Sequence, residues 1–124
     1  MGATAGTTGY SKTFAGSAGS NAIGDYAWYN GNVSDSKSRP VGGKLPNELG
    51  LCDMSGNVWE WCWDWYGTYP AGEQTDYRGL ASGSFRVFRG GSFNFDASRC
   101  ALARRGSGNP FVQDYSYGFR VVRP

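Results

Sequence analysis

Two acidic side chains near the middle of the sequence lie close to a tight turn. Asp53 precedes a Ser-Gly-Asn turn at residues 55–57, and Glu60 follows it. Carboxylates, together with backbone carbonyls freed by a turn, form the all-oxygen shell that calcium prefers. The same spacing also fits a structure without a metal, in which Glu60 pairs with an arginine and Asp53 caps a turn. The spacing alone leaves both interpretations open.

The residues that most often perform catalysis are scarce. The chain has three cysteines, Cys52, Cys62 and Cys100, and no histidine. The cysteines lack the CxxC spacing of a zinc site and are too few for a disulfide framework. Histidine is the most frequent general base and metal ligand. The sequence therefore disfavours an enzyme, and it leaves the disulfide state of the cysteines open.

Length, charge and hydropathy exclude several classes of protein. The 124 residues fit one domain. A net charge of +2 and a pI near 8.5 are too low for a nucleic-acid-binding surface. No apolar run is long enough to insert into a membrane, and residues 1–12 lack the apolar core of a signal peptide. Compartment and oligomeric state stay undecided.

The pattern of turns and apolar alternation predicts an α+β fold with a small antiparallel sheet and mostly irregular loops. Residues 1–24 are rich in Gly and Ser and are predicted to form an N-terminal arm, with the folded domain at 25–124. Strands are expected near residues 58–65, 85–89 and 118–123. Pro46 is expected to open a short helical turn that ends at Gly50.

Tryptophan occupies every second position of the first predicted strand, at residues 59, 61, 63 and 65. In a strand these side chains share one face, opposite Glu60, Cys62 and Asp64. The row could bind sugar rings or form one wall of the core. An exposed row of indoles would be a large adhesive patch on the protein, so the core wall is the favoured interpretation.

Three motifs together resemble a known family. The series LPNELGLCDMSGNVWEW, RVFRGGSF and GFRVVR is similar to the formylglycine-generating enzyme (sulfatase-modifying factor) family, whose domains have a variant of the C-type lectin fold. The resemblance runs from about Phe14 to Arg123. The usual N-terminal half of the family is absent, so the chain is expected to be either a fragment or a short member.

The resemblance implies a calcium site and argues against a copper site. Family members with calcium in this loop use positions that match Asp53, Gly56, Val58 and Glu60. The catalytic members hold copper with two cysteines, and counting from Gly90 those positions are Phe95 and Cys100. A gapped alignment would leave no catalytic thiol at all. On either alignment the thiolate pair that Cu(I) prefers is missing, so no copper and no oxidase activity are expected. An oxidase, or a fragment of one, that acts on protein cysteine through Cys100 is the alternative.

Residues 93–117, between two of the motifs, resemble the variable region of a second branch of this fold, the variable proteins of diversity-generating retroelements. Those proteins are thought to vary at NNY codons, which exclude Lys, Glu, Gln, Met and Trp. Only Gln113 of these types occurs in the segment, against 14 in the other 99 residues. This distribution agrees with the resemblance.

The segment also has the composition of a binding surface. Tyr and Phe give rigid contact area, and Ser, Gly, Asn and Asp give adaptable hydrogen bonds. The sequence thus predicts a non-catalytic domain that displays a variable surface to a protein or surface ligand of unknown identity. The predicted display positions are Phe93, Phe95, Asp96, Arg99, Leu102, Arg105, Ser107, Gly108, Phe111, Asp114, Tyr115 and Ser116. Leu102 and Phe93 are the two most expected to be core.

Overall fold

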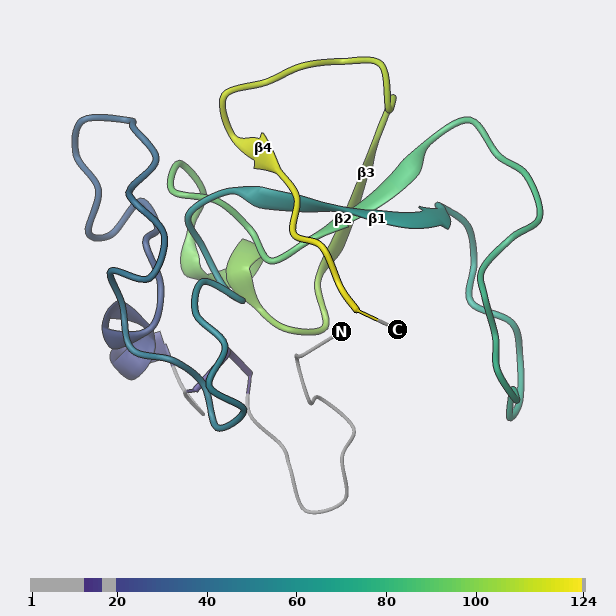
Figure 1. Ribbon diagram of the computed structural model, residues 1–124, viewed down its shortest axis with the longest axis horizontal. Coiled ribbons are helices and arrows are strands. Elements are labelled where there is room, and N and C mark those ends of the chain that lie inside the picture. The colour runs from purple at the N-terminus through teal and green to yellow at the C-terminus, as the bar shows by residue number, and fades with distance from the viewer. Residues whose placement is uncertain (1–12, 17–19, 124) are drawn as a thin grey trace.

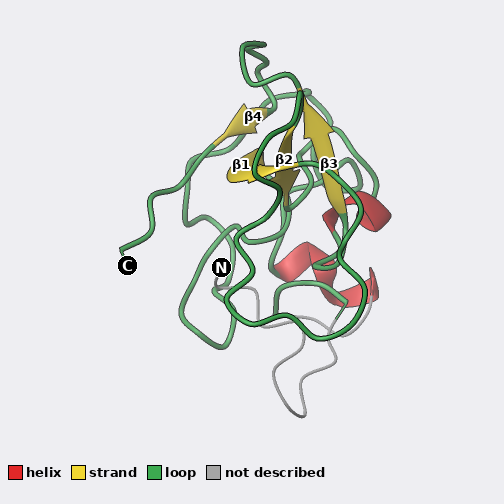
Figure 2. Cartoon of the chain, turned by 90° about the vertical axis from the view of Figure 1, so that its right-hand side faces the viewer, coloured by secondary structure: helices red, strands yellow, loops and turns green. Residues whose placement is uncertain are grey.

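The computed structural model describes residues 13–16 and 20–123, and they form a small curled sheet surrounded by loops (Figure 1). The described elements are η1 (Ser20–Asp25), β1 (Trp59–Trp65), β2 (Arg86–Arg89), η2 (Ala97–Cys100), β3 (Arg105–Gly108) and β4 (Tyr117–Gly118). The two short 3₁₀ helices lie together on one side of the sheet (Figure 2). Neither has the length and apolar character that a bilayer-crossing helix needs, and the described residues contain no other candidate.

The sheet is mixed, whereas the sequence predicted an antiparallel one. Its strand order is β3-β2-β1-β4. The β1–β2 and β2–β3 pairs are antiparallel, but β4 runs parallel to β1 and pairs only with Trp59 and Glu60. The strand predicted at 118–123 was also wrong beyond Gly118. No described strand lies beside residues 119–123, so Phe119 and Val121 stay 76% and 87% exposed.

Strand β3 was missed because its sequence, RGSG, has no apolar alternation. It pairs with all of β2, from Arg89 opposite Arg105 to Arg86 opposite Gly108. The glycines allow this pairing, because a Cβ at Gly106 would overlap the ring of Phe88. A tertiary contact, not local propensity, therefore makes this segment a strand.

The tryptophan row is not a uniform core wall, which corrects the sequence interpretation. Trp59 is 3% exposed, Trp61 and Trp65 are half-buried, and Trp63 is 84% exposed. The pairing of β1 with β2 is irregular between Trp61 and Trp65, so Trp63 lies at a break in the ladder. Arg86 packs over the rings of Trp63 and Trp65, at 4.7 and 3.6 Å from their centroids.

The core cluster draws on both ends of the described chain. Phe14, Ile23, Ala27 and Cys100 pack together and are each at most 4% exposed. Phe14 and Ile23 belong to the segment predicted as an N-terminal arm, so its described part is packed. The rest of that predicted arm, residues 1–12 and 17–19, lies outside the described residues.

The turn at residues 53–57 is tied to this core by a buried hydroxyl. The Ser55 Oγ donates to the carbonyl of Cys100 at 2.8 Å and accepts from the amide of Ala15 at 3.2 Å. Gly56, with φ of +80°, leaves no room for a side chain against the Trp28 carbonyl. The turn is therefore held rigidly at the start of β1.

The segment around Pro46 forms a turn and not a helix. The Asn47 Oδ1 accepts from the amides of Leu49 and Leu51, at 2.9 and 3.0 Å. This side chain competes with helical hydrogen bonds and closes the turn instead. Gly50 has a φ of +77°, the left-handed conformation expected where the sequence placed a stop.

Candidate functional site

A cavity of about 300 Å³ opens between the sheet and the segment 94–117. Its floor is aromatic. The Trp59 ring lies 4.8 Å from Phe88 and 5.8 Å from Phe95, and Phe88 lies 5.1 Å from Tyr117. Trp59 and Phe88 are buried, so the floor is part of the folded core. Its size is at the lower end of the range for ligand pockets.

The rim of the cavity is polar and carries an ionised carboxylate. Asp114 accepts through Oδ1 from the amide of Ser116 at 2.8 Å, and from the Ser116 hydroxyl. These hydrogen bonds hold the pKa of Asp114 below its ordinary value. Burial, and then the charge of Asp114, raises the pKa of Tyr117, which stays protonated at neutral pH. The lining thus contains both an ionised carboxylate and a protonated phenol.

A cation lies on the same rim. Arg99 belongs to η2, whose N-cap Asp96 accepts from the Arg99 amide at 3.3 Å. The Arg99 guanidinium lies 5.6 Å from the centroid of Phe95. Among the described residues, neither Arg99 nor Asp114 forms an ion pair. The hydrogen bond from Ser98 and, to a smaller extent, the charge of Arg99 lower the pKa of Asp96, so Arg99 has an acidic neighbour although it forms no ion pair. Arg99 and Asp114 thus line one cavity without an ion pair between them.

Five of the twelve predicted display positions line this cavity: Phe95, Arg99, Ser107, Asp114 and Ser116. Three come from the segment before β3 or from β3, and two from the segment that leads into β4. Ser116 is 4% exposed and reaches the cavity from below the surface. The fold thus gathers positions that are up to 21 residues apart in sequence, from Phe95 to Ser116.

Seven predicted display positions lie elsewhere. Phe93 and Leu102 are core residues, 1% and 5% exposed. Phe111 and Tyr115 are 91% and 68% exposed, outside the cavity lining. The remaining three have structural contacts: Asp96 caps η2, Arg105 stacks on Tyr69 at 3.8 Å, and Gly108 lies against Phe88.

Sequence reasoning did not include five residues that complete the lining: Trp59, Phe88, Asn94, Gly106 and Tyr117. Asn94 is a polar residue of the variable-like segment and could have been found by composition. Gly106 could not, because its position depends on the missed strand β3. Trp59 and Phe88 come from the predicted strands, but only the packing shows that their edges face the segment.

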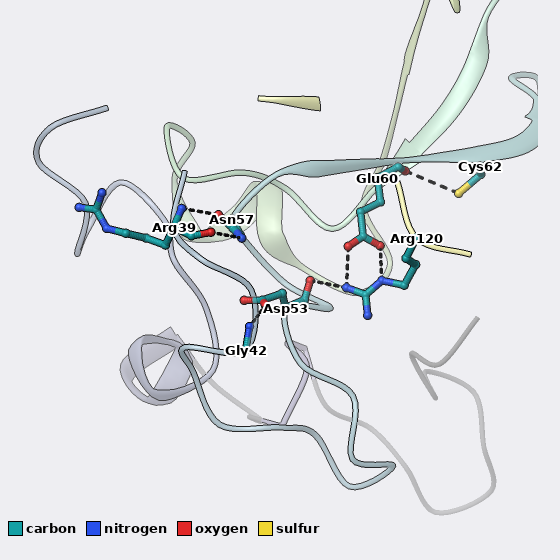
Figure 3. Close-up of polar contacts among 7 residues, drawn as sticks. All are labelled: Arg39, Gly42, Asp53, Asn57, Glu60, Cys62 and Arg120. Carbon is teal, nitrogen blue, oxygen red and sulfur yellow. Dashed lines mark hydrogen bonds and ion pairs between the residues drawn. The ribbon is translucent and has the colours of Figure 1, made fainter. Parts of the chain in front are cut away.

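A second cluster lies at the turn that the sequence singled out for calcium (Figure 3). Arg120 donates two hydrogen bonds to the Glu60 carboxylate, from Nε to Oε2 at 2.7 Å and from Nη2 to Oε1 at 2.5 Å. Arg120 also donates to the carbonyl of Asp53 at 3.0 Å. Of the two interpretations left open by the spacing, the structure contains the arginine pair at Glu60.

Only one of the two oxygens of the Asp53 carboxylate has a hydrogen-bond partner. Its Oδ2 accepts from the amide of Gly42 at 2.8 Å, whereas its buried Oδ1 has no partner. A buried carboxylate oxygen without a partner is costly, and a cation or water would relieve it. The donor set implied by the resemblance therefore fits calcium at Asp53 but not at Glu60, unless Arg120 releases Glu60.

The cysteines are arranged in a way that bears on catalysis. Cys52, Cys62 and Cys100 are all free thiols, so no disulfide joins them. Cys100 is 0% exposed and is absent from the cavity lining. Burial raises the pKa of Cys100 to about 12. The thiol that the sequence identified as a catalytic remnant is thus protonated and enclosed.

Similar proteins agree with the motifs. The chain is 43% identical to the formylglycine-generating enzyme of Streptomyces coelicolor over 88 aligned residues. The aligned region covers 67% of this chain and 28% of that enzyme. It is 44% identical over 84 residues to the serine/threonine-protein kinase pkn1 of Chlamydia pneumoniae, covering 63% of this chain and 13% of the kinase. The chain spans less than a third of the length of either relative.

A solved structure gives a likeness over most of the fold. Treponema denticola variable protein 1 superposes with a TM-score of 0.83 and 42% identity, over 90% of this chain and 40% of that one. The fold is therefore the formylglycine-generating-enzyme variant of the C-type lectin fold. The chain also matches the family described as sulfatase-modifying factor enzyme 1-like domain across residues 2–124. It belongs to that family of formylglycine-generating-enzyme-like domains.

Proposed function

We propose that this domain is a non-catalytic ligand-recognition domain, which displays a variable surface formed by residues 93–117 on a rigid aromatic core. The main support is the cavity described above, where an aromatic floor carries a polar rim with unpaired charges. The likeness to a variable protein supports the same conclusion. The ligand is a protein or another surface ligand.

The division between floor and rim supports a display role. Trp59 and Phe88 belong to paired strands and are buried, so their replacement would disturb the fold. Asn94, Arg99 and Asp114 are exposed and use only local hydrogen bonds. Exposed positions of this kind tolerate substitution within about 0.5 kcal/mol each. The rim can therefore change its chemistry while the floor holds the fold.

The test is a library in which Asn94, Arg99, Ser107 and Asp114 are randomised and the chain is displayed on yeast. Folding is read with a conformation-dependent tag or a protease challenge, and binding is selected against a panel of unrelated proteins. We expect most members to stay folded and several targets to yield binders. A control library at Phe93, Leu102 and Val87, all buried, should lose folding. Loss of folding in the rim library, or no binders, would contradict the proposal.

The rival function is that of the enzymes in the family, oxidation of a cysteine in a protein substrate. The identity to the Streptomyces coelicolor enzyme favours it. It is disfavoured because Cys100 is enclosed and Phe95 stands where the first thiol of the pair would be. Incubation with copper and a cysteine peptide that bears the sulfatase motif, followed by mass spectrometry, tests it. We expect no formylglycine, and its formation would establish the rival.

Calcium as a structural ion at Asp53, Gly56, Val58 and Glu60 is a separate proposal. The unpartnered, buried Oδ1 of Asp53 supports it. The two hydrogen bonds from Arg120 to Glu60 oppose it, because calcium must displace the guanidinium to reach that carboxylate. Calcium and Arg120 therefore compete for Glu60, and the competition can be measured.

A further inference from the structure

The two unpaired charges on the cavity rim restrict the ligand, and this inference rests on the proposed recognition function. Arg99 and Asp114 both line the cavity, and neither has an ion-pair partner in the described part of the chain. A ligand with a single charge would gain from one of them and be repelled by the other. A ligand with both signs satisfies both.

The groups around the two charges fit the same requirement. The Asn94 Oδ1 already accepts from the Ser92 hydroxyl at 2.5 Å, which leaves its NH₂ group to donate to a ligand. The Asp114 Oδ1 is likewise used by Ser116, which leaves Oδ2 to accept. The rim therefore offers amide and guanidinium donors for an anion and one carboxylate oxygen for a cation.

The aromatic floor of the cavity determines which uncharged body the ligand should have between its charged groups. Phe95 and Tyr117 are only half-buried, so their rings are accessible from the cavity above the buried Trp59 and Phe88. Stacked and edge contacts with these rings favour an apolar or aromatic body. The volume of about 300 Å³ accommodates a group no larger than one side chain with its charged termini.

We infer that the cavity recognises a zwitterionic group, in which an aromatic body carries a carboxylate that binds Arg99 and an ammonium that binds Asp114. A free aromatic amino acid has this chemistry. An aromatic residue flanked by an acidic and a basic side chain on a protein surface has it too. The two sources share the same recognition and can be separated by experiment.

The first arm of the experiment uses four probes with the same aromatic body. They are L-phenylalanine, N-acetyl-L-phenylalanine, L-phenylalaninamide and N-acetyl-L-phenylalaninamide, which are zwitterionic, anionic, cationic and neutral. The second arm compares the peptides acetyl-Glu-Phe-Lys-amide and acetyl-Gln-Phe-Gln-amide. Each probe is titrated into the ¹⁵N-labelled protein, and the amide signals of Gly106, Ser107 and Tyr117 are followed by NMR.

We expect the zwitterionic probe of at least one arm to bind tightest. An exposed charge pair contributes up to about 1 kcal/mol, so blocking either charge should weaken binding roughly fivefold. Arg99→Gln should remove the preference for a free carboxylate, and Asp114→Asn the preference for a free ammonium. Arg104→Gln and Asp76→Asn are matched controls, since both residues are exposed and lie outside the lining.

The outcomes separate this inference from the proposed function. Charge-dependent binding in the first arm identifies a free amino acid as the source, and in the second arm a protein surface. Equal binding of neutral and zwitterionic probes, or no binding in either arm, overturns the inference. Because the library test uses protein targets instead of these probes, it can still succeed in that case, and the display function then stands without the zwitterion.

Discussion

The two charged regions of this domain use their charges in opposite ways. At the start of β1, Glu60 and Arg120 neutralise each other, and the guanidinium also holds the Asp53 carbonyl. At the cavity rim, neither Arg99 nor Asp114 forms an ion pair with any residue that the structure describes. The first arrangement ties the C-terminal segment to the sheet, whereas the second leaves charges for something outside the chain. Similar residue types thus stabilise the fold in one place and provide a surface in the other.

The largest expected effect concerns the alkylation rate of the buried Cys100 thiol. Its pKa of about 12 lies 3 units above the ordinary 9.0, so alkylation at pH 8 should be on the order of a thousandfold slower than for an ordinary thiol. Iodoacetamide labelling, read by peptide mass spectrometry, should modify the half-buried Cys52 first. Denaturant should remove the difference, and equal labelling in native buffer would contradict the burial.

The raised pKa also sets a pH dependence. The folded state holds the Cys100 proton more tightly than the unfolded state, so this contribution to stability is complete below pH 9 and is lost as the pH rises toward 12. Stability measured between pH 8 and 10 should therefore fall less steeply in Cys100→Ala, although its starting stability is lower.

The second effect separates core residues from exposed residues within the segment 93–117. Phe93→Ala should cost about 3–5 kcal/mol of unfolding free energy, because the ring is 1% exposed. Phe111→Ala is the matched control, since Phe111 is 91% exposed and should change stability by less than about 0.5 kcal/mol. Urea unfolding measures both. Similar losses at the two positions would show that the segment has no division into core and display residues.

The third effect tests the neutralised pair. Arg120→Met should cost about 1–3 kcal/mol, because it removes charged hydrogen bonds to Glu60 and one to the Asp53 carbonyl. Arg123→Met, at an exposed position three residues further along the chain, is the control. A double-mutant cycle with Glu60→Gln should give a coupling of about 1 kcal/mol. No coupling would mean that the pair is not formed in solution.

The fourth effect asks whether calcium replaces Arg120. Calcium at ten times its Kd should add about 1.4 kcal/mol of stability, seen as a rise in the thermal midpoint. Glu60→Gln should remove this increment. Arg120→Met should strengthen calcium binding, because the guanidinium no longer competes for Glu60. If the thermal midpoint is the same with calcium and with chelator, the calcium proposal is wrong, and Glu60 is bound by Arg120 alone.

The smallest expected effect is at the rim. Replacing Asn94, Arg99, Ser107 or Asp114 singly by alanine should change the unfolding free energy by no more than about 0.5 kcal/mol, since none of these side chains is buried. Circular dichroism during thermal unfolding measures the change. A collapse of the midpoint would mean that the rim is structural, and the contrast between the two charged regions would disappear.

Prediction from sequence succeeded where the information is local. The motifs identified the family, and the strands at 59–65 and 86–89 follow from alternation and glycine stops. It failed where a distant partner decides the outcome. Trp63 is exposed although it continues the alternation, and it lies where the β1–β2 pairing is irregular. Strand β3 pairs with β2 because Gly106 fits under Phe88. Composition also could not show which display positions face the cavity: five of the twelve line it, and the other seven remain predictions about the surface or lie in the core.

The sequence by itself determined the family, the absence of histidine, and a segment with the composition of a binding surface. These properties depend on residue identity and order alone. Tertiary structure decided which charged side chains form ion pairs within the domain. Glu60 and Arg120 are sixty residues apart and meet only because β4 lies beside β1. Arg99 and Asp114 stay available because the fold places both on one cavity, where neither forms an ion pair with another described residue.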